Sequence, residues 1–173
     1  MFRTRLLAVI LVLSALLFSC SGEDGATGPA GKNGANGNAN VIVFQYDTRT
    51  TTTGNINYTF LASQGLVDSS IVLGYYNPST EAPTAWYPVP GLGSSGAYMT
   101  RCLWYQSTAD PSTYTYRVFL LTPSGAATYT TSTTFTKFKI ILVPASVITP
   151  ETSRGLLDLS DYNAVMDYLK LSD

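Results

Sequence analysis

The chain has 173 residues and contains no histidine. This absence excludes Ser-His-Asp and Cys-His catalysis and a histidine-ligated zinc site, and it removes the usual general base near neutral pH. Charged side chains are also scarce, at 12% of residues, and the formal net charge is −1. The chain therefore lacks the basic character typical of nucleic-acid-binding proteins, and we expect no nucleic-acid partner.

Cysteine is equally scarce, with Cys20 and Cys102 as the two thiols of the chain. If Cys20 is modified, Cys102 has no partner within the chain, so a disulfide framework is excluded. Cys102 lies in an apolar run beside Leu103 and Trp104, without a histidine to activate it. We interpret it as a buried structural thiol rather than as a nucleophile. No metal site and no cofactor are expected.

The first twenty residues combine a short basic region with an apolar run. Arg3 and Arg5 precede Leu6–Phe18, which is apolar but for one serine, and Leu17–Cys20 closes the run. A membrane-spanning helix needs about 20 apolar residues, so the pattern indicates a cleaved leader. The segment resembles a bacterial lipoprotein signal, which implies cleavage before Cys20 and attachment of lipid to its sulfur. The alternative is an ordinary signal peptide whose cysteine is incidental.

Glycine recurs at every third position from Gly22 to Gly37. This is the Gly-X-Y register of collagen, in which only glycine fits the axis of the triple helix. Pro29 is the one proline of the stretch, so we interpret it as a flexible tether, with a trimerising stub as the alternative. The chain is thus divided into a leader at 1–19, a tether at 20–40 and a domain at 41–173.

From Val41 onward, Tyr, Thr, Val and Ile become frequent and are punctuated by clusters of Gly, Pro, Asn and Ser. This pattern is typical of an all-β domain with short strands. Apolar and polar residues alternate, as in antiparallel sheets with one packed face, so we predict a sandwich of about seven to eight strands. The expected strands are 41–46, 56–61, 71–76, 85–89, 98–106, 114–121, 128–134 and 135–143, of which the last two could form one long strand.

One helix is expected at the C-terminus, after Ser160, which suits an N-cap. The apolar residues Tyr162, Val165, Met166 and Leu169 fall at i, i+3, i+4 and i+7, and so form one stripe. A helix of about 11 residues is marginal alone in water. We therefore expect it to pack on the β domain.

Both ends of the chain resemble a group of bacterial cell-surface lipoproteins of unknown function that carry a short collagen-like Gly-X-Y stub after the lipidated cysteine. The resemblance rests on Leu17–Cys20, on the glycine register, and on Ile140–Ser146 and Asp158–Tyr162. It implies a lipid-anchored β domain with a short terminal helix, located in the cell envelope, at the outer membrane or cell surface. It implies no catalytic residues.

Three aromatic doublets stand in expected strands. The doublets are Tyr75-Tyr76, Trp86-Tyr87 and Trp104-Tyr105. Adjacent strand residues point to opposite faces, so the two rings of each doublet lie on opposite sides of the sheet. We expect the second ring, assigned to Tyr76, Tyr87 and Tyr105, to lie on the outer face or under the terminal helix, where an exposed ring could bind a sugar or a partner protein. The alternative is that these rings pack against the helix or are ordinary strand residues.

Two further patterns are weaker. Gly91–Gly96 matches the dinucleotide-binding pattern G-x-G-x-x-G, but prolines precede it and a β run follows it, so we interpret it as a loop between strands. The carboxylates Asp68, Glu81 and Asp110 fall in expected loops or turns and could converge at one end of the domain, as a glycosidase requires. Turn chemistry explains Asp110, which precedes a proline, more simply.

We therefore expect a lipid-anchored envelope or cell-surface protein, monomeric and non-catalytic, that binds a glycan or a protein partner and is held to the membrane through lipid on Cys20. A structural or assembly subunit of an envelope complex is the alternative. A carboxylate-dependent hydrolase is a more remote one.

Overall fold

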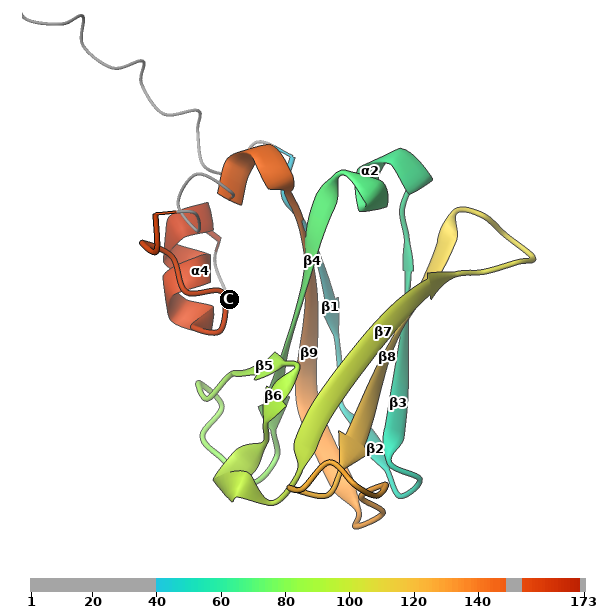
Figure 1. The fold of residues 1–173 in the computed structure, drawn as a ribbon, viewed down its shortest axis with the longest axis vertical. Helices are drawn as coiled ribbons and strands as arrows, with labels where there is room; N and C mark the ends of the chain where they lie inside the picture. Colours follow the sequence, from blue (N-terminus) through green and yellow to red (C-terminus); the bar gives the residue numbers. More distant parts are fainter. Residues whose placement is uncertain (1–39, 149–153, 172–173) are drawn as a thin grey trace, which may run out of the picture. The chain divides into compact units, whose positions relative to one another are not determined.

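The computed structural model describes residues 40–148 and 154–171 (Figure 1). These residues form two antiparallel sheets packed face to face, with a short helix at the C-terminal end. The expected all-β sandwich is confirmed, with nine strands in the described part of the chain. The predicted leader, the lipid-attachment residue Cys20 and the tether up to residue 39 lie outside the described residues. None of the described helices is long and apolar enough to cross a membrane.

Each sheet follows a simple order. Sheet A has the order β1-β9-β4-β5, with β2 also paired to β9, and sheet B has the order β3-β8-β7-β6. The strands of sheet A are β1 (Ile42–Tyr46), β2 (Arg49–Thr51), β4 (Ser70–Pro78), β5 (Tyr87–Val89) and β9 (Thr133–Pro144). The strands of sheet B are β3 (Asn55–Leu61), β6 (Gly91–Leu92), β7 (Met99–Gln106) and β8 (Thr113–Leu121).

The expected strand at 128–134 is mostly wrong. Residues 128–132 form a loop, in which Thr128 makes a single bridge to Leu121, and only the last two residues belong to β9. Threonine favours strands, but a strand also needs a neighbour with free backbone groups, and Leu121 ends β8 here. The structure also adds the short helix α2 (Gln64–Asp68), which begins after Ser63 and crosses from sheet B to sheet A.

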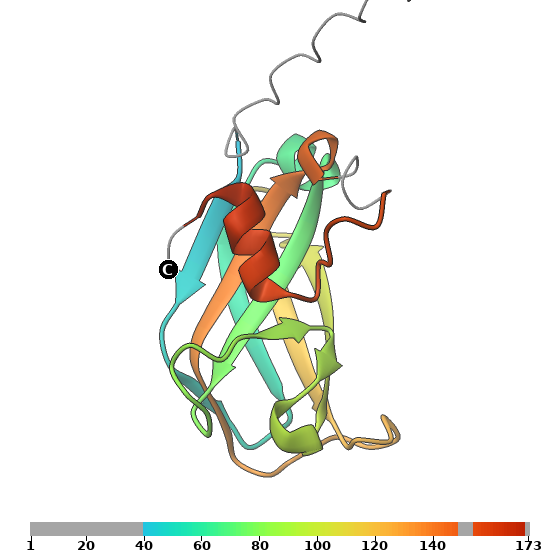
Figure 2. The same ribbon diagram turned by 90° about the vertical axis from the view of Figure 1, so that its left-hand side faces the viewer.

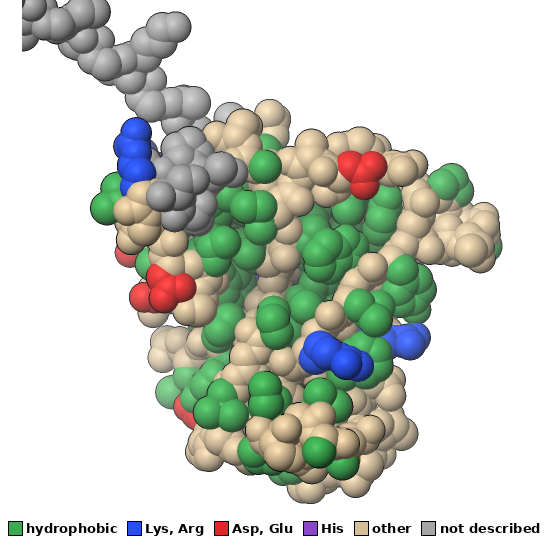
Figure 3. Space-filling view, in the orientation of Figure 1, with side chains coloured by type: hydrophobic (Ala, Val, Ile, Leu, Met, Phe, Trp, Pro, Cys, Tyr) green, Lys and Arg blue, Asp and Glu red, His purple; other side chains and the backbone are tan. Residues whose placement is uncertain are grey.

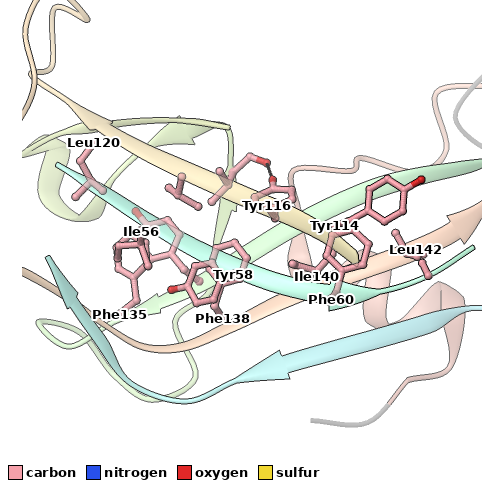
Figure 4. Packing of buried hydrophobic residues seen from close by; sticks show 14 of the residues in the cluster. Ile56, Tyr58, Phe60, Tyr114, Tyr116, Leu120, Phe135, Phe138, Ile140 and Leu142 are labelled. Carbon is pink, nitrogen blue, oxygen red and sulfur yellow. Dashed lines mark hydrogen bonds between the residues drawn. The ribbon is translucent and has the colours of Figure 1, made fainter. Parts of the chain in front are cut away.

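The space between the sheets is filled largely by aromatic rings (Figure 4). Tyr58 of β3 stacks on Phe138 of β9, with ring centroids 4.0 Å apart and planes 9° apart. Both rings are fully buried, as is Tyr116 of β8, whose ring lies 5.6 Å from Phe138. Each such burial stabilises the fold by about 1.5–3 kcal/mol. The buried residues of β3 and β8 thus alternate with outward ones, as the alternation of apolar and polar residues in the sequence predicts.

The helix α4 (Tyr162–Leu169) covers the outer face of sheet A (Figure 2). Its apolar stripe is buried, as expected, and packs against Ile141 and Val143 of β9. The N-cap is Asp161, which accepts the Ala164 N–H at 3.1 Å. The expected cap at Ser160 is wrong, because the Ser160 hydroxyl donates to Asp158 instead.

Lys139 of β9 lies on the covered face of sheet A, and its side chain is only 2% exposed. Because strand residues alternate, Lys139 points to the opposite side of the sheet from Phe138 and Ile140, and α4 covers it there. Its ammonium donates to the Tyr162 hydroxyl at 2.6 Å and lies 4.8 Å from the Trp86 ring centroid. The outer face of sheet B differs, because in the described part of the chain no helix covers it (Figure 1).

Candidate functional site

Tyr76 does not reach the surface. Its side chain is 0% exposed and points between the sheets. There its ring stacks on that of Phe135, with the two ring centroids 4.1 Å apart. The expected exposed ring is therefore wrong for Tyr76. The rule of one ring to each side still holds, because Tyr75 lies on the outer face of sheet A and contacts Tyr162 of α4. The register decides the choice, since Tyr76 pairs with the inward Phe138.

Tyr87 is half-buried on the inward side of β5, where it stacks on Tyr76 at 5.6 Å and donates its hydroxyl to Glu81 at 2.7 Å. Its neighbour Trp86 is the ring under α4, stacked on Tyr162 at 4.7 Å. The second doublet thus also divides between the two faces, but with the opposite assignment to the one expected.

Tyr105 does lie on an outer face, and its side chain is 41% exposed. It belongs to β7, on the uncovered side of sheet B. The three tyrosines therefore form no row, because Tyr76 and Tyr87 face the interior and Tyr105 faces water.

Around Tyr105, the strand register gathers arginines and aromatic rings on one side of sheet B. Arg101 pairs with Phe119, and Arg117 pairs with both Leu103 and Asn57, so these side chains share the face of Tyr105. We call this surface the arginine–aromatic face. It consists of Asn57 on β3, Arg101, Leu103 and Tyr105 on β7, and Arg117 and Phe119 on β8.

Cations and rings alternate along this face. The Arg101 guanidinium lies 5.0 Å from the Phe119 ring centroid, and that of Arg117 lies 5.9 Å from Phe119 and 5.6 Å from Tyr105. Arg117 also donates to the Asn57 side-chain oxygen at 2.8 Å and to the Tyr105 hydroxyl at 3.1 Å. These contacts hold Arg117 and Tyr105 in fixed positions, so a ligand would find them already arranged.

The charged side chains of this face are all positive. The strands β3, β6, β7 and β8 contain no Asp or Glu. Among the described residues, the Arg101 guanidinium makes a ring contact but no hydrogen bond or ion pair, so its N–H groups are available. In Figure 3 basic side chains lie beside hydrophobic ones over β7 and β8. A guanidinium of this kind matches the two oxygens of a carboxylate.

The carboxylates considered from the sequence do not converge. Asp68 ends α2, and Asp110 lies in the β7–β8 hairpin at the same end of the sandwich, whereas Glu81 follows β4 at the opposite end (Figure 1). Hydrogen bonds from Ser112 and Thr113 lower the pKa of Asp110, as expected for a turn residue. The described residues contain no group of three or more potential metal-ligating side chains.

Cys102 is half-buried on the inward side of β7. Its sulfur lies 4.0 Å from the Val89 carbonyl oxygen, and burial raises the pKa of its thiol. A raised pKa lowers the fraction of thiolate, which is the nucleophilic form. This environment agrees with the structural interpretation of the residue.

The arrangement on sheet B is suited to binding through cations, flat rings and amide groups. The alternation of residues along 98–106 places Arg101 on the same side as Tyr105, but it does not show that Arg117, Phe119 and Asn57 lie beside them. Their own strands show that they point outward, but only the pairing of β3, β8 and β7 brings them together. No protein-family model, no curated protein and no solved structure matches the chain.

Proposed function

We propose that the protein is a lipid-anchored envelope or cell-surface protein, attached through Cys20, whose sandwich is a non-catalytic binding module for a glycan that carries carboxylate groups. The observation that carries the proposal is the arginine–aromatic face, which combines cations and rings on strands without a single acidic residue. The anchor rests on the leader sequence, in which the apolar run ends at Leu17–Cys20.

The chemistry of the face favours an acidic glycan. Arg101 can donate two parallel hydrogen bonds to a carboxylate, and the exposed ring of Tyr105 offers a flat surface to the C–H groups of a sugar. Asn57 is exposed beside them and can bond sugar hydroxyls with the part of its amide that Arg117 leaves unused. A ligand of opposite charge would also be attracted to the face before contact.

Binding is tested with polygalacturonate as the acidic glycan and dextran as the neutral one, by affinity electrophoresis of the full-length protein. We expect retardation by polygalacturonate. Arg101→Gln should weaken it about tenfold or more, because a hydrogen bond between charged groups contributes about 1.5–3 kcal/mol. Tyr105→Ala should weaken it as well.

The matched control is Lys137→Gln, which removes the same charge from an exposed position on β9, in the other sheet. Retardation should remain at the wild-type level in this variant. Equal losses in Arg101→Gln and Lys137→Gln would show that only net charge matters, and would contradict a site on sheet B. If acidic glycans fail while an envelope protein binds in an Arg101-dependent way, the partner is a protein.

The anchor is tested separately, by mass spectrometry of the N-terminal peptide from the membrane fraction. We expect a mature chain that begins at Cys20 and carries a diacylglyceryl group on the sulfur. A Cys20→Ala variant should retain its leader. A bare sulfur in the native protein would contradict lipid anchoring, whatever the result of the glycan assay.

A further inference from the structure

Residues of three connections between strands, β4 to β5, β6 to β7 and β8 to β9, line a hollow of about 320 Å³. These connections lie at the end of the sandwich opposite α2 (Figure 1). The residues that line the hollow include two tyrosines, Tyr98 and Tyr129, and eight residues with aliphatic hydroxyls. The described chain enters the sandwich at Asn40, at the α2 end, so the hollow faces away from the point of entry (Figure 1).

Hydrogen bonds between the connections hold the hollow open. The Ser94 hydroxyl donates to Glu81 at 2.6 Å and lies 3.1 Å from the Thr80 hydroxyl, which ties the β6–β7 connection to the β4–β5 connection. The Ser79 N–H donates to the Thr134 carbonyl oxygen at 3.0 Å, which ties the latter connection to the start of β9. The wall is therefore assembled before any ligand arrives.

The backbone at Ser95 supports a functional interpretation. Its φ of 52° is left-handed, which residues other than Gly, Asn and Asp rarely adopt, and the next residue, Gly96, also has a positive φ of 69°. Backbone strain of this kind gathers at binding sites. The segment is the one that carries the G-x-G-x-x-G pattern. In the structure it forms β6 and a 3-10 turn, without the strand-to-helix geometry that a dinucleotide needs.

The lining carries hydroxyls and rings but no charge. None of its residues is Asp, Glu, Lys or Arg. Four of the lining hydroxyls make no hydrogen bond within the described part of the chain and can therefore bond to a ligand. They belong to Ser79, Ser95, Thr131 and Ser132. Tyr129 is half-buried, with its ring centroid 5.4 Å from that of Tyr98, and so provides an apolar wall.

We propose that this hollow, which we call the end pocket, binds one neutral pyranose residue of a glycan. Hydroxyl side chains both donate and accept, as sugar hydroxyls do, and the Tyr129 ring can receive the C–H face of the sugar. A charged ligand is disfavoured, because it would lose water without gaining a counter-charge from the lining. The volume is at the lower end of the range for small-molecule sites. The site is separate from the arginine–aromatic face and does not depend on the function proposed for it.

The test uses the full-length protein in a detergent without a sugar headgroup, and saturation-transfer NMR with methyl pyranosides of glucose, galactose, mannose and N-acetylglucosamine. We expect transfer to at least one of them. Galactose and galacturonate form a matched pair that differs in a carboxylate. In the Arg101→Gln variant, which weakens the acidic-glycan site, galactose should give the stronger transfer. No transfer to any neutral pyranoside, or stronger transfer to galacturonate than to galactose in Arg101→Gln, would overturn the proposal.

Two variants locate the site. Tyr129→Ala should lower the affinity about fivefold, because a ring contact contributes a factor of this order. Ser132→Phe, at an exposed position, should fill the pocket at little cost to the fold and abolish transfer. If both variants melt at the wild-type temperature and still bind the sugar as well as the wild type, the pocket is not the site.

The control variant is Tyr105→Ala, on the arginine–aromatic face. It should leave transfer to the neutral sugar unchanged, and Tyr129→Ala should leave retardation by polygalacturonate unchanged. This crossed pattern separates the two proposals, so that either can fail without the other. A loss of neutral-sugar binding in Tyr105→Ala alone would overturn the assignment to the end pocket.

Discussion

Replacing Tyr162 by phenylalanine tests whether the buried hydrogen bond beneath α4 stabilises the fold. Tyr162 is 4% exposed, and its hydroxyl accepts from the Lys139 ammonium at 2.6 Å. Hydrogen bonds to charged groups contribute about 1.5–3 kcal/mol each, and a buried charge that loses its acceptor is costly. Tyr162→Phe keeps the ring, whose centroid lies 5.2 Å from the ammonium, and removes only the hydroxyl. We expect the free energy of unfolding to fall by about 1.5–3 kcal/mol.

The matched control is Tyr58→Phe. The Tyr58 hydroxyl is buried, and it has no hydrogen-bond partner among the described residues. Its ring stacks on Phe138 and remains in the variant. Removing this hydroxyl should therefore lower the free energy of unfolding by no more than about 0.5 kcal/mol. It could also raise it, because the variant no longer buries a polar group without a hydrogen bond.

Both variants are measured by urea unfolding, followed by tryptophan fluorescence and circular dichroism. A double-mutant cycle of Tyr162→Phe with Lys139→Met then isolates the pairwise term, which we expect to exceed about 1 kcal/mol. If Tyr162→Phe loses no more stability than Tyr58→Phe, the hydrogen bond between Tyr162 and Lys139 gives no net stabilisation. That result would refute the reasoning.

Three further predictions concern the backbone, the helix cap and the pH. Gly74→Ala should destabilise the fold by about 1–3 kcal/mol, because a Cβ there would lie 2.4 Å from the Tyr116 hydroxyl, whereas Gly65→Ala in α2 meets no atom within 4 Å and should be neutral or stabilising in thermal melts. Asp161→Ala should cost about 0.5–2 kcal/mol and loosen α4, as seen by hydrogen exchange. Burial, opposed by Arg49, raises the pKa of Tyr46 from 10.0 to about 12. The contribution of this shift to stability is therefore constant below pH 10 and is lost as the pH rises from 10 to about 12. In thermal melts at alkaline pH, Tyr46→Phe should reduce the fall of the melting temperature over that range.

The inward residues of the long strands could be predicted from the sequence because a period of two needs no partner. Tyr58 and Phe60 alternate with polar residues, and so do Tyr116 and Val118, and all four side chains are buried. The strands β6 and β2 could not be predicted, because they have two and three residues, too few to show a period. Their pairing is decided by the strands beside them.

The candidate sites could not be predicted, because they depend on contacts between residues that are far apart along the sequence. The arginine–aromatic face exists because the register sets Arg101 opposite Phe119 and Arg117 opposite Asn57. The end pocket exists because three connections, far apart along the chain, meet at one end of the sandwich. Glu81 illustrates the same limit. Its hydrogen bonds from Ser94 and Tyr87, which lower the pKa of its carboxyl, join the β4–β5 connection to the β6–β7 connection and to β5, and they brace the structure.

The aromatic doublets divide according to what covers each sheet. Tyr75 and Trp86 point outward from sheet A and pack under α4, so neither ring of the first two doublets lies on an exposed face. The third doublet stands on β7 of the uncovered sheet. Trp104 and Tyr105 are 45% and 41% exposed, and no other aromatic side chain in the described part of the chain is exposed by more than 40%.

The edge of sheet B accounts for this double exposure. The short strand β6 pairs with β7 only at Met99 and Thr100, so the far half of β7 has no neighbour on that side. Trp104 points inward but lies at this open edge, and Tyr105 points outward beside Arg117. A helix over sheet B, like α4 over sheet A, would have covered Tyr105. The uncovered half of β7 is therefore the part of the described fold where aromatic side chains are most exposed to a ligand.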